Sequence, residues 1–134
     1  MGIIVDTAYT HRAAAAGLTE AMIRDVIDAF YGKVRRDPTL GPVFDGIIKD
    51  GWPAHMERIA SFWLTATRLG SGYEGRRFMP AHTAHASIEA AHLPRWLELF
   101  RATTAERCPP EAAEVLDDIA VRMADSIRIG LSRR

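Results

Sequence analysis

The feature that most constrains the fold is the spacing of apolar residues between Thr19 and Arg36. Apolar side chains recur there at intervals of three and four residues, which predicts one buried face of an α-helix rather than a strand. Thr19 is a suitable N-cap, and Asp37 is disfavoured in helical geometry because it precedes Pro38. We therefore predict a helix that ends near Arg36. Its inward face consists of Ile23, Val26, Ile27, Phe30, Tyr31 and Val34.

Two segments follow before the first glycine-rich stretch. Residues 40 to 48, LGPVFDGII, are interpreted as a turn that leads into a short apolar segment. A second helix is expected to start with Pro53 at its first position and to stop before Gly70. Its apolar stripe includes a histidine and is flanked by Trp52, Met56 and Trp63. The members of the stripe are His55, Ile59, Phe62, Ala66 and Leu69.

The C-terminal part of the chain predicts two more helices. One begins between Glu89 and Leu93, because Pro94 is tolerated only in a first turn, and it stops at the run from Cys108 to Pro110. The other ends near Gly130, and its apolar positions are Val115, Leu116, Ile119, Met123 and Ile127. No alternating strand pattern and no internal repeat is found. We predict an all-α domain with about four substantial helices at residues 19 to 134, preceded by a short N-terminal arm at residues 1 to 18.

Composition narrows the class of protein. The chain has 134 residues, with 17 Lys plus Arg and 17 Asp plus Glu, so it offers no basic stripe for nucleic acid or an anionic membrane. Its single cysteine, Cys108, excludes an internal disulfide and a cysteine-based zinc site, and it suits a reducing compartment. The start of the chain lacks the pattern of a secretion signal or a membrane span, so we expect a cytoplasmic protein.

Residues 76 to 96, RRFMPAHTAHASIEAAHLPRW, contain three of the five histidines. Glycines precede this segment and prolines interrupt it, so its histidines lie where regular structure is weakest. A ligand site and a solvated connection are both compatible with that pattern. A zinc site formed by His82, His85 and His92 is a further alternative, although no carboxylate or thiolate partner is evident.

Polar groups also occur on the predicted inward faces of the helices. Tyr31, His55 and Trp96 bring a hydroxyl, an imidazole and an indole N–H among bulky aromatic residues. Each group costs about 1–3 kcal/mol if it is buried without a partner, so something polar is expected between them. An apolar pocket with a few convergent polar groups is typical of a small-molecule or cofactor site. The alternative is that all three belong to an ordinary core.

Four motifs together resemble the truncated haemoglobins of group III. They are AFYGKVRRDPTLGPVF at residues 29 to 44, WPAHMERIASFW at 52 to 63, MPAH at 79 to 82, and WLELF at 96 to 100. The resemblance spans residues 19 to about 130. It implies a two-over-two helical sandwich that encloses haem b, iron protoporphyrin IX, with a histidine bound to the iron.

The resemblance also assigns residues to the haem site. His82 matches the proximal iron ligand, and Tyr31, His55 and Trp96 match the distal polar residues, with His55 either gating or bonding the ligand. The positions expected to line the macrocycle are Phe30, Phe44, Ile59, Phe62 and Met79. The open axial position implies binding of O2 and related diatomic ligands. Redox or detoxification chemistry on oxygen, nitric oxide or peroxide, with an external reductase, is a further implication.

The chain departs from the family pattern after its Y-x-G sequence, where it reads YEGRRFM and lacks a proline that the family often has. This departure leaves His85, three residues from His82, as a rival iron ligand. Arg76 and Arg77 are candidates for the haem propionates or for a solvated charge pair. A different class of function, a cofactor-free helical interaction domain, is the alternative to a haem protein.

Overall fold

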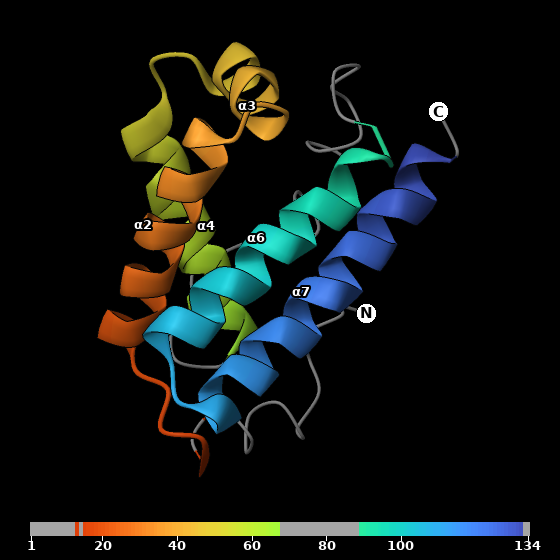
Figure 1. The fold of residues 1–134 in the computed structure, drawn as a ribbon. Helices are drawn as coiled ribbons and strands as arrows, with labels where there is room; N and C mark the ends of the chain where they lie inside the picture. Colours follow the sequence, from red (N-terminus) through yellow and green to blue (C-terminus); the bar gives the residue numbers. More distant parts are fainter. Residues whose placement is uncertain (1–12, 14, 68–88, 133–134) are drawn as a thin grey trace.

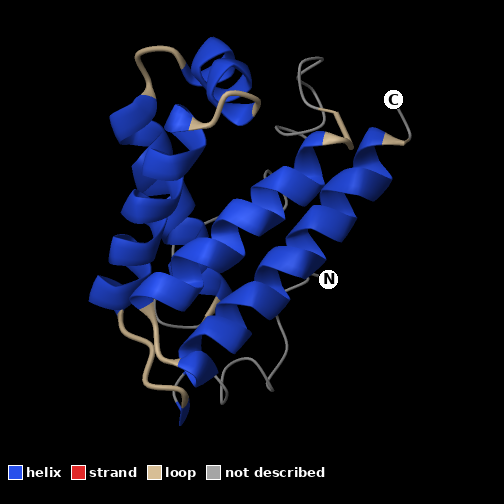
Figure 2. Cartoon of the chain, viewed as in Figure 1, coloured by secondary structure: helices blue, strands red, loops and turns tan. Residues whose placement is uncertain are grey.

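The described part of the computed structural model contains helices and loops only (Figure 2). It covers residue 13, residues 15 to 67 and residues 89 to 132. Within these ranges the prediction of an all-α chain is confirmed. The helices are α2 (Glu20–Arg36), α3 (Leu40–Ile48), α4 (Trp52–Ala66), α6 (His92–Arg107) and α7 (Pro110–Leu131).

The helices form two layers. In Figure 1, α2 lies beside α4 and α6 lies beside α7, and the second pair runs obliquely across the first. Helix α2 contacts α3, α4 and α6, so it lies at the centre of the arrangement, while the short helix α3 caps one end of the sandwich. The two-over-two helical sandwich expected from the sequence is therefore present.

The predicted boundaries of α2 are correct. The Thr19 hydroxyl accepts a hydrogen bond from the Met22 amide at 3.1 Å, as an N-cap does. The helix ends at Arg36 because Asp37, which precedes Pro38, adopts extended geometry with φ −71° and ψ 131°.

Helix α3 corrects the interpretation of residues 40 to 48 as a turn and a short apolar segment. The whole of Leu40–Ile48 is helical. Pro42 is compatible because it lies in the first turn, where a backbone N–H has no helical partner. Gly41 is required by close packing, since a Cβ there would lie 2.6 Å from the Arg35 carbonyl oxygen. The helix ends with Lys49 at φ 55°.

The other boundaries differ from prediction by small amounts. Helix α4 begins at Trp52, so Pro53 is its second residue rather than its first, and Gly70 lies outside the described residues. Helix α6 begins at His92, within the predicted interval, and ends just before Cys108. Helix α7 ends at Leu131, next to the predicted Gly130.

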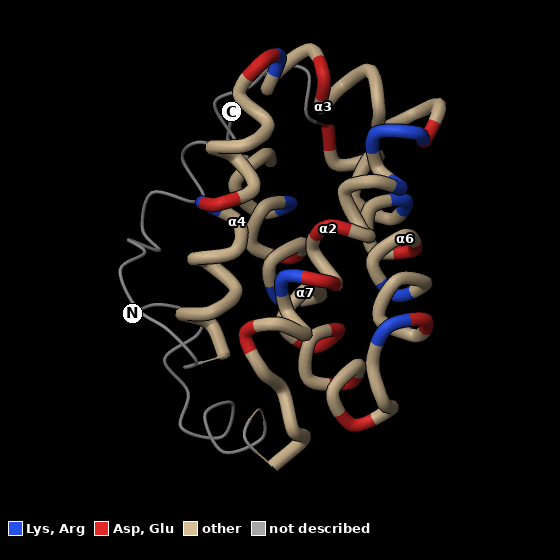
Figure 3. Tube along the Cα trace, turned by 90° about the vertical axis from the view of Figure 1, so that its left-hand side faces the viewer, with Lys and Arg blue, Asp and Glu red and all other residues tan. Residues whose placement is uncertain are grey.

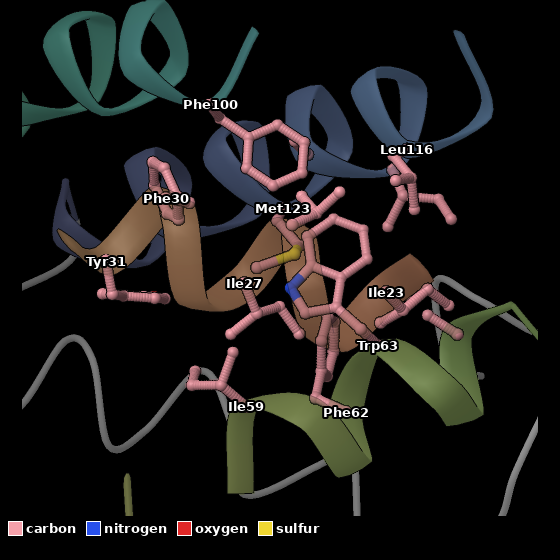
Figure 4. Close-up of a cluster of buried hydrophobic side chains, with 14 of the residues drawn as sticks. Ile23, Ile27, Phe30, Tyr31, Ile59, Phe62, Trp63, Phe100, Leu116 and Met123 are labelled. Carbon is pink, nitrogen blue, oxygen red and sulfur yellow. The ribbon is translucent and has the colours of Figure 1, made fainter. Parts of the chain in front are cut away.

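The core is built from the predicted helix faces. Every member of the α2 face and every predicted apolar position of α7 is buried. Phe100 of α6 lies at the centre, stacked on Trp63 at a ring-centroid distance of 5.2 Å and edge-on to Phe30 at 5.1 Å. Figure 4 shows these rings meeting from three helices, with Leu116 and Met123 of α7 beside them.

The start of the chain and the surface add two observations. Ala13 and Leu18 are buried in the core, so the described end of the predicted N-terminal arm packs against the domain. Acidic and basic residues are interspersed along the described helices (Figure 3). No helix in the described ranges is long and apolar enough to cross a membrane.

Candidate functional site

Tyr31 is the least exposed of the three polar residues predicted for the site, which are Tyr31, His55 and Trp96. It lies on the inner face of α2 and is 6% exposed. Burial raises the pKa of its phenol above the ordinary value, and a hydrogen bond from the Trp96 side chain opposes that rise. The phenol therefore stays neutral and keeps its proton under ordinary conditions. Tyr31 of α2 and Trp96 of α6, which are 65 positions apart in the sequence, are therefore in contact.

The aromatic rings around Tyr31 come from four helices. Tyr31 is edge-on to His55 of α4 at 5.7 Å and to Phe44 of α3 at 6.2 Å between ring centroids. Phe30, the preceding residue, is edge-on to Trp96 of α6 at 5.4 Å. The structure thus brings these five residues, predicted for the site from separate motifs, into one connected cluster.

Ile59 and Phe62 extend this cluster along α4. They lie one and nearly two turns after His55 and are 5% and 2% exposed. Figure 4 shows both on α4, on the side that carries Trp63 and faces α2. Both are therefore core residues that continue the apolar wall beyond the imidazole.

The apolar side chains of α3 are less completely covered. Only Leu40 and Gly41 of this helix are buried, whereas its other large apolar residues pack against the core and stay partly exposed. Those residues are Val43, Phe44, Ile47 and Ile48. Helix α3 therefore presents apolar surface beside the ring of Tyr31, which Phe44 contacts directly.

The residues predicted on the other side of the site lie outside the described part of the chain. They are the proposed ligand His82, the lining residue Met79, the rival His85, and Arg76 and Arg77. His92, the third member of the alternative zinc site, begins α6 and accepts a hydrogen bond from the Glu89 amide at 3.0 Å. Among the described residues, no group of three or more His, Cys, Asp or Glu side chains is arranged to hold a metal.

Sequence reasoning missed an ion pair at the junction of α2, α3 and α6, in which the Asp37 carboxylate is buried and the Arg95 side chain is 40% exposed. One oxygen of Asp37 accepts the amides of Thr39 and Leu40 at 3.0 and 2.9 Å. The other contacts the Arg95 guanidinium at 2.7 and 2.8 Å. The hydrogen bond from Leu40, with those from Arg95 and Thr39, lowers the pKa of Asp37 below its usual range. The pair joins the start of α3 to the residue before Trp96, and the extended Asp37-Pro38 step was its only local signal.

Trp52 is the second missed residue. The sequence places it beside the apolar stripe of α4 and gives no indication of its partners. In the structure its ring lies 6.0 Å from that of Tyr31 and 5.7 Å from that of His55. Its indole N–H donates to Asp45 of α3 at 3.0 Å. Trp52 is thus part of the ring cluster around Tyr31.

Comparison with known proteins gives two informative matches. No family profile matches the chain. It is 29% identical over 86 residues to the group 3 truncated hemoglobin ctb of Campylobacter jejuni, and the match covers 62% of this chain and 67% of that protein. Its fold is similar to the crystal structure of a group III truncated hemoglobin from Campylobacter jejuni, with a TM-score of 0.78 and 25% sequence identity. That alignment covers 85% of this chain and 91% of the other.

The two matches agree with the motifs and with the architecture. The four motifs lie on α2, α3, α4 and α6 or, in the sequence, between α4 and α6, and the fold of the chain is similar to that of the matched structure. In both sequence and fold the chain is similar to truncated haemoglobins of group III, the family that its motifs resemble.

Proposed function

We propose that this chain binds haem b and takes up O2 and related diatomic ligands at the haem iron. The observation that carries the proposal is the cluster in which Tyr31, His55 and Trp96 bring three polar tips together among aromatic rings. An apolar site with a few convergent polar groups is the usual form of a cofactor pocket. The matched relatives are hemoglobins by name, which supports the same function here.

The residues present fit a haem group. A flat macrocycle needs an extended apolar wall, and the partly exposed side chains of α3 beside Phe44 offer one. Covering that surface would stabilise the complex, because burying apolar area contributes about 25 cal/mol per Å2. We assign Phe30, Phe44, Ile59 and Phe62 to the lining. Met79 is proposed for the lining and His82 for the proximal iron ligand on the motif match alone.

Haem bound here would supply an iron that a diatomic ligand can bind, and His82 would hold that iron. Tyr31 keeps its proton because burial raises its pKa, so its hydroxyl remains a hydrogen-bond donor to a ligand. The indole N–H of Trp96, which has no other charge state, donates to the Tyr31 hydroxyl and so orients it. Donors on rigid apolar bodies keep water out of the pocket while polarising what binds there. The pocket therefore favours polar ligands such as O2 over carbon monoxide.

We extend the proposal to redox chemistry. The polarity, hydrogen-bond donors and steric access of a distal pocket decide between oxygen binding, activation and electron transfer, and a donor such as the Tyr31 hydroxyl would serve activation as well as binding. Reduction or detoxification of oxygen, nitric oxide or peroxide would require electrons from a separate reductase.

The first experiment separates the haem protein from a cofactor-free helical domain. The protein as purified is expected to be red and to show a strong Soret band. His82→Gly is expected to lose haem on dilution, and added imidazole is expected to restore the ferrous spectrum.

His85→Ala is the matched control, since it removes the neighbouring imidazole of the same segment. It is expected to keep its haem. Colourless protein that takes up no added haem would overturn the proposal, and loss of haem in His85→Ala alone would transfer the ligand assignment to His85.

A further inference from the structure

We infer that Trp52 is a positioning residue, which holds the His55 imidazole edge-on against Tyr31 and is itself held by Asp45 and Arg35. The inference deepens the proposed function, because His55 is one of the distal groups. It concerns the orientation of a side chain, however, and it does not require that haem be bound.

The first observation is that the His55 ring contacts two other aromatic rings, those of Trp52 and Tyr31. Trp52 and His55 are three residues apart on α4, so they are neighbours on its surface. Their ring centroids are 5.7 Å apart at an interplanar angle of 88°, and the angle between His55 and Tyr31 is 87° at 5.7 Å. Trp52 also contacts Tyr31, at 6.0 Å. Each ring therefore limits the rotation of the other two.

The second observation is that Trp52 is anchored from two other helices. Its indole N–H donates to the Asp45 carboxylate of α3 at 3.0 Å. The Arg35 guanidinium of α2 lies 4.5 Å from the centroid of the Trp52 ring, an arrangement that attracts a cation to an aromatic face. Arg35 and Asp45 also contact each other at 3.3 Å, which closes the cluster.

The physical consequence concerns the freedom of His55. The half-buried imidazole lies in the first turn of α4, and a ring there has rotamers that point inward and outward. With the indole fixed by Asp45, the ring of Trp52 supports the inward rotamer, which touches Tyr31. Without that hydrogen bond the indole can rotate, and the inward rotamer of His55 loses its packing contact with the Trp52 ring.

The test compares two aspartates that are similar in exposure and in the distance of their ion pair but differ in whether they also bind Trp52. Asp45 pairs with Arg35 at 3.3 Å, and Asp25 pairs with Arg107 at the same distance. Their side chains are 48% and 51% exposed. Only Asp45 also accepts the indole of Trp52. Asp25→Ala therefore removes an equivalent surface ion pair without touching the ring cluster.

The measurement is the nuclear Overhauser contact between the His55 and Tyr31 rings in the purified protein, in its carbon monoxide form if it carries haem. Asp45→Ala is expected to weaken this contact, because losing one net hydrogen bond lowers the equilibrium constant between the inward and outward rotamers about fivefold. Asp25→Ala is expected to leave it unchanged. Asp45→Asn keeps an oxygen acceptor for the indole and is expected to retain the contact.

Trp52→Phe keeps a ring but lacks the N–H, so it tests the same step should Asp45→Ala fail to fold. It is expected to weaken the His55–Tyr31 contact to a similar extent. The inference is overturned if the contact persists in whichever of these variants folds, or if Asp25→Ala weakens it equally. A protein that takes up no haem but shows this dependence on Asp45 would contradict the proposed function alone.

Discussion

The two ends of the buried face of α2 use the same helical spacing for different purposes. At the first end, Ile23, Val26 and Ile27 carry no polar atoms in their side chains, and Figure 4 shows two of them among the apolar side chains of α4 and α7. At the other end, Tyr31 meets an imidazole and two indoles. Spacing predicts burial at both ends, but only the polar tips indicate a site.

The difference teaches how stability and function are divided in this chain. The apolar end, with α7 behind it, gains stability from close packing and has no group that can respond to a ligand. The end near Tyr31 buries donors and leaves apolar surface of α3 partly exposed, which a packed core would not do. Substitutions should therefore change unfolding at one end and ligand exchange at the other.

The largest expected effect lies at the apolar end. Leu116 of α7 is 1% exposed, and Leu116→Ala should lower the free energy of unfolding by about 3 kcal/mol, measured by urea denaturation. The rate of oxygen release should stay within about twofold of the wild-type value, because the cavity left by the smaller side chain lies away from Tyr31 and Trp96. Ile129→Ala, at a side chain that is 45% exposed, is the control and should change stability by less than about 0.5 kcal/mol. A large change in oxygen release in Leu116→Ala would break the division between the two ends.

The second effect is stabilisation of the polar end by haem. At a free haem concentration about 100 times the dissociation constant, binding should stabilise the fold by roughly 2.7 kcal/mol. Differential scanning calorimetry of haem-free and haem-loaded protein should register this as a higher melting temperature. Equal melting temperatures would argue against a haem pocket at this end.

The third effect is at the junction of α2, α3 and α6. Asp37→Asn should destabilise the protein by about 2 kcal/mol at neutral pH, the scale of hydrogen bonds to a charged group. The pKa of Asp37 is lowered in the folded state, so its contribution is full above its unfolded pKa and is lost as the pH falls through the folded pKa.

Urea unfolding across acidic pH should therefore show a loss of stability in the wild type that Asp37→Asn largely lacks. Asp25→Asn, in an ion pair with a 51% exposed carboxylate, is the matched control and should behave like the wild type. An identical acid response in Asp37→Asn and the wild type would show that the ion pair between Asp37 and Arg95 contributes little.

The smallest expected change in free energy is the most specific to the polar end. Tyr31→Phe and Trp96→Phe should each speed oxygen release about fivefold to tenfold, the equivalent of a net hydrogen bond of about 1–1.5 kcal/mol. Carbon monoxide release should change less because carbon monoxide is less polar. The double variant should depart from additivity, since Trp96 hydrogen-bonds to Tyr31. Oxygen release within about twofold of the wild type in both variants would return these residues to an ordinary core role.

Much of the fold was predictable because its signals are local. Several features depend on residues within one or two turns of each other. They are the buried face of α2, the Thr19 cap, the end of α2 before Pro38 and the end of α6 at Cys108. Helix α3 was not predicted. Its first amides are satisfied by Asp37, whose other oxygen is held by Arg95 from a distant helix, and local propensity carries no trace of that contact.

The candidate site divides in the same way. The sequence by itself determined that Tyr31, His55 and Trp96 face inward on different helices, because the helical period assigns each residue to a face. Only the packing of α2, α3, α4 and α6 decided how these residues assemble with Phe30 and Phe44. The same packing decided the hydrogen bond between Trp96 and Tyr31. His82 and Met79 lie outside the described residues and remain predictions from the motif match.

Trp52 illustrates what only the tertiary structure decided. From the sequence it is a tryptophan next to a proline at the start of a helix, and many packing arrangements suit such a residue. Its contacts with Tyr31 and Arg35 join positions that lie 17 or more residues away along the chain. Periodicity determines which face of a helix is buried, but the partners of that face depend on how the helices pack, which no local pattern encodes.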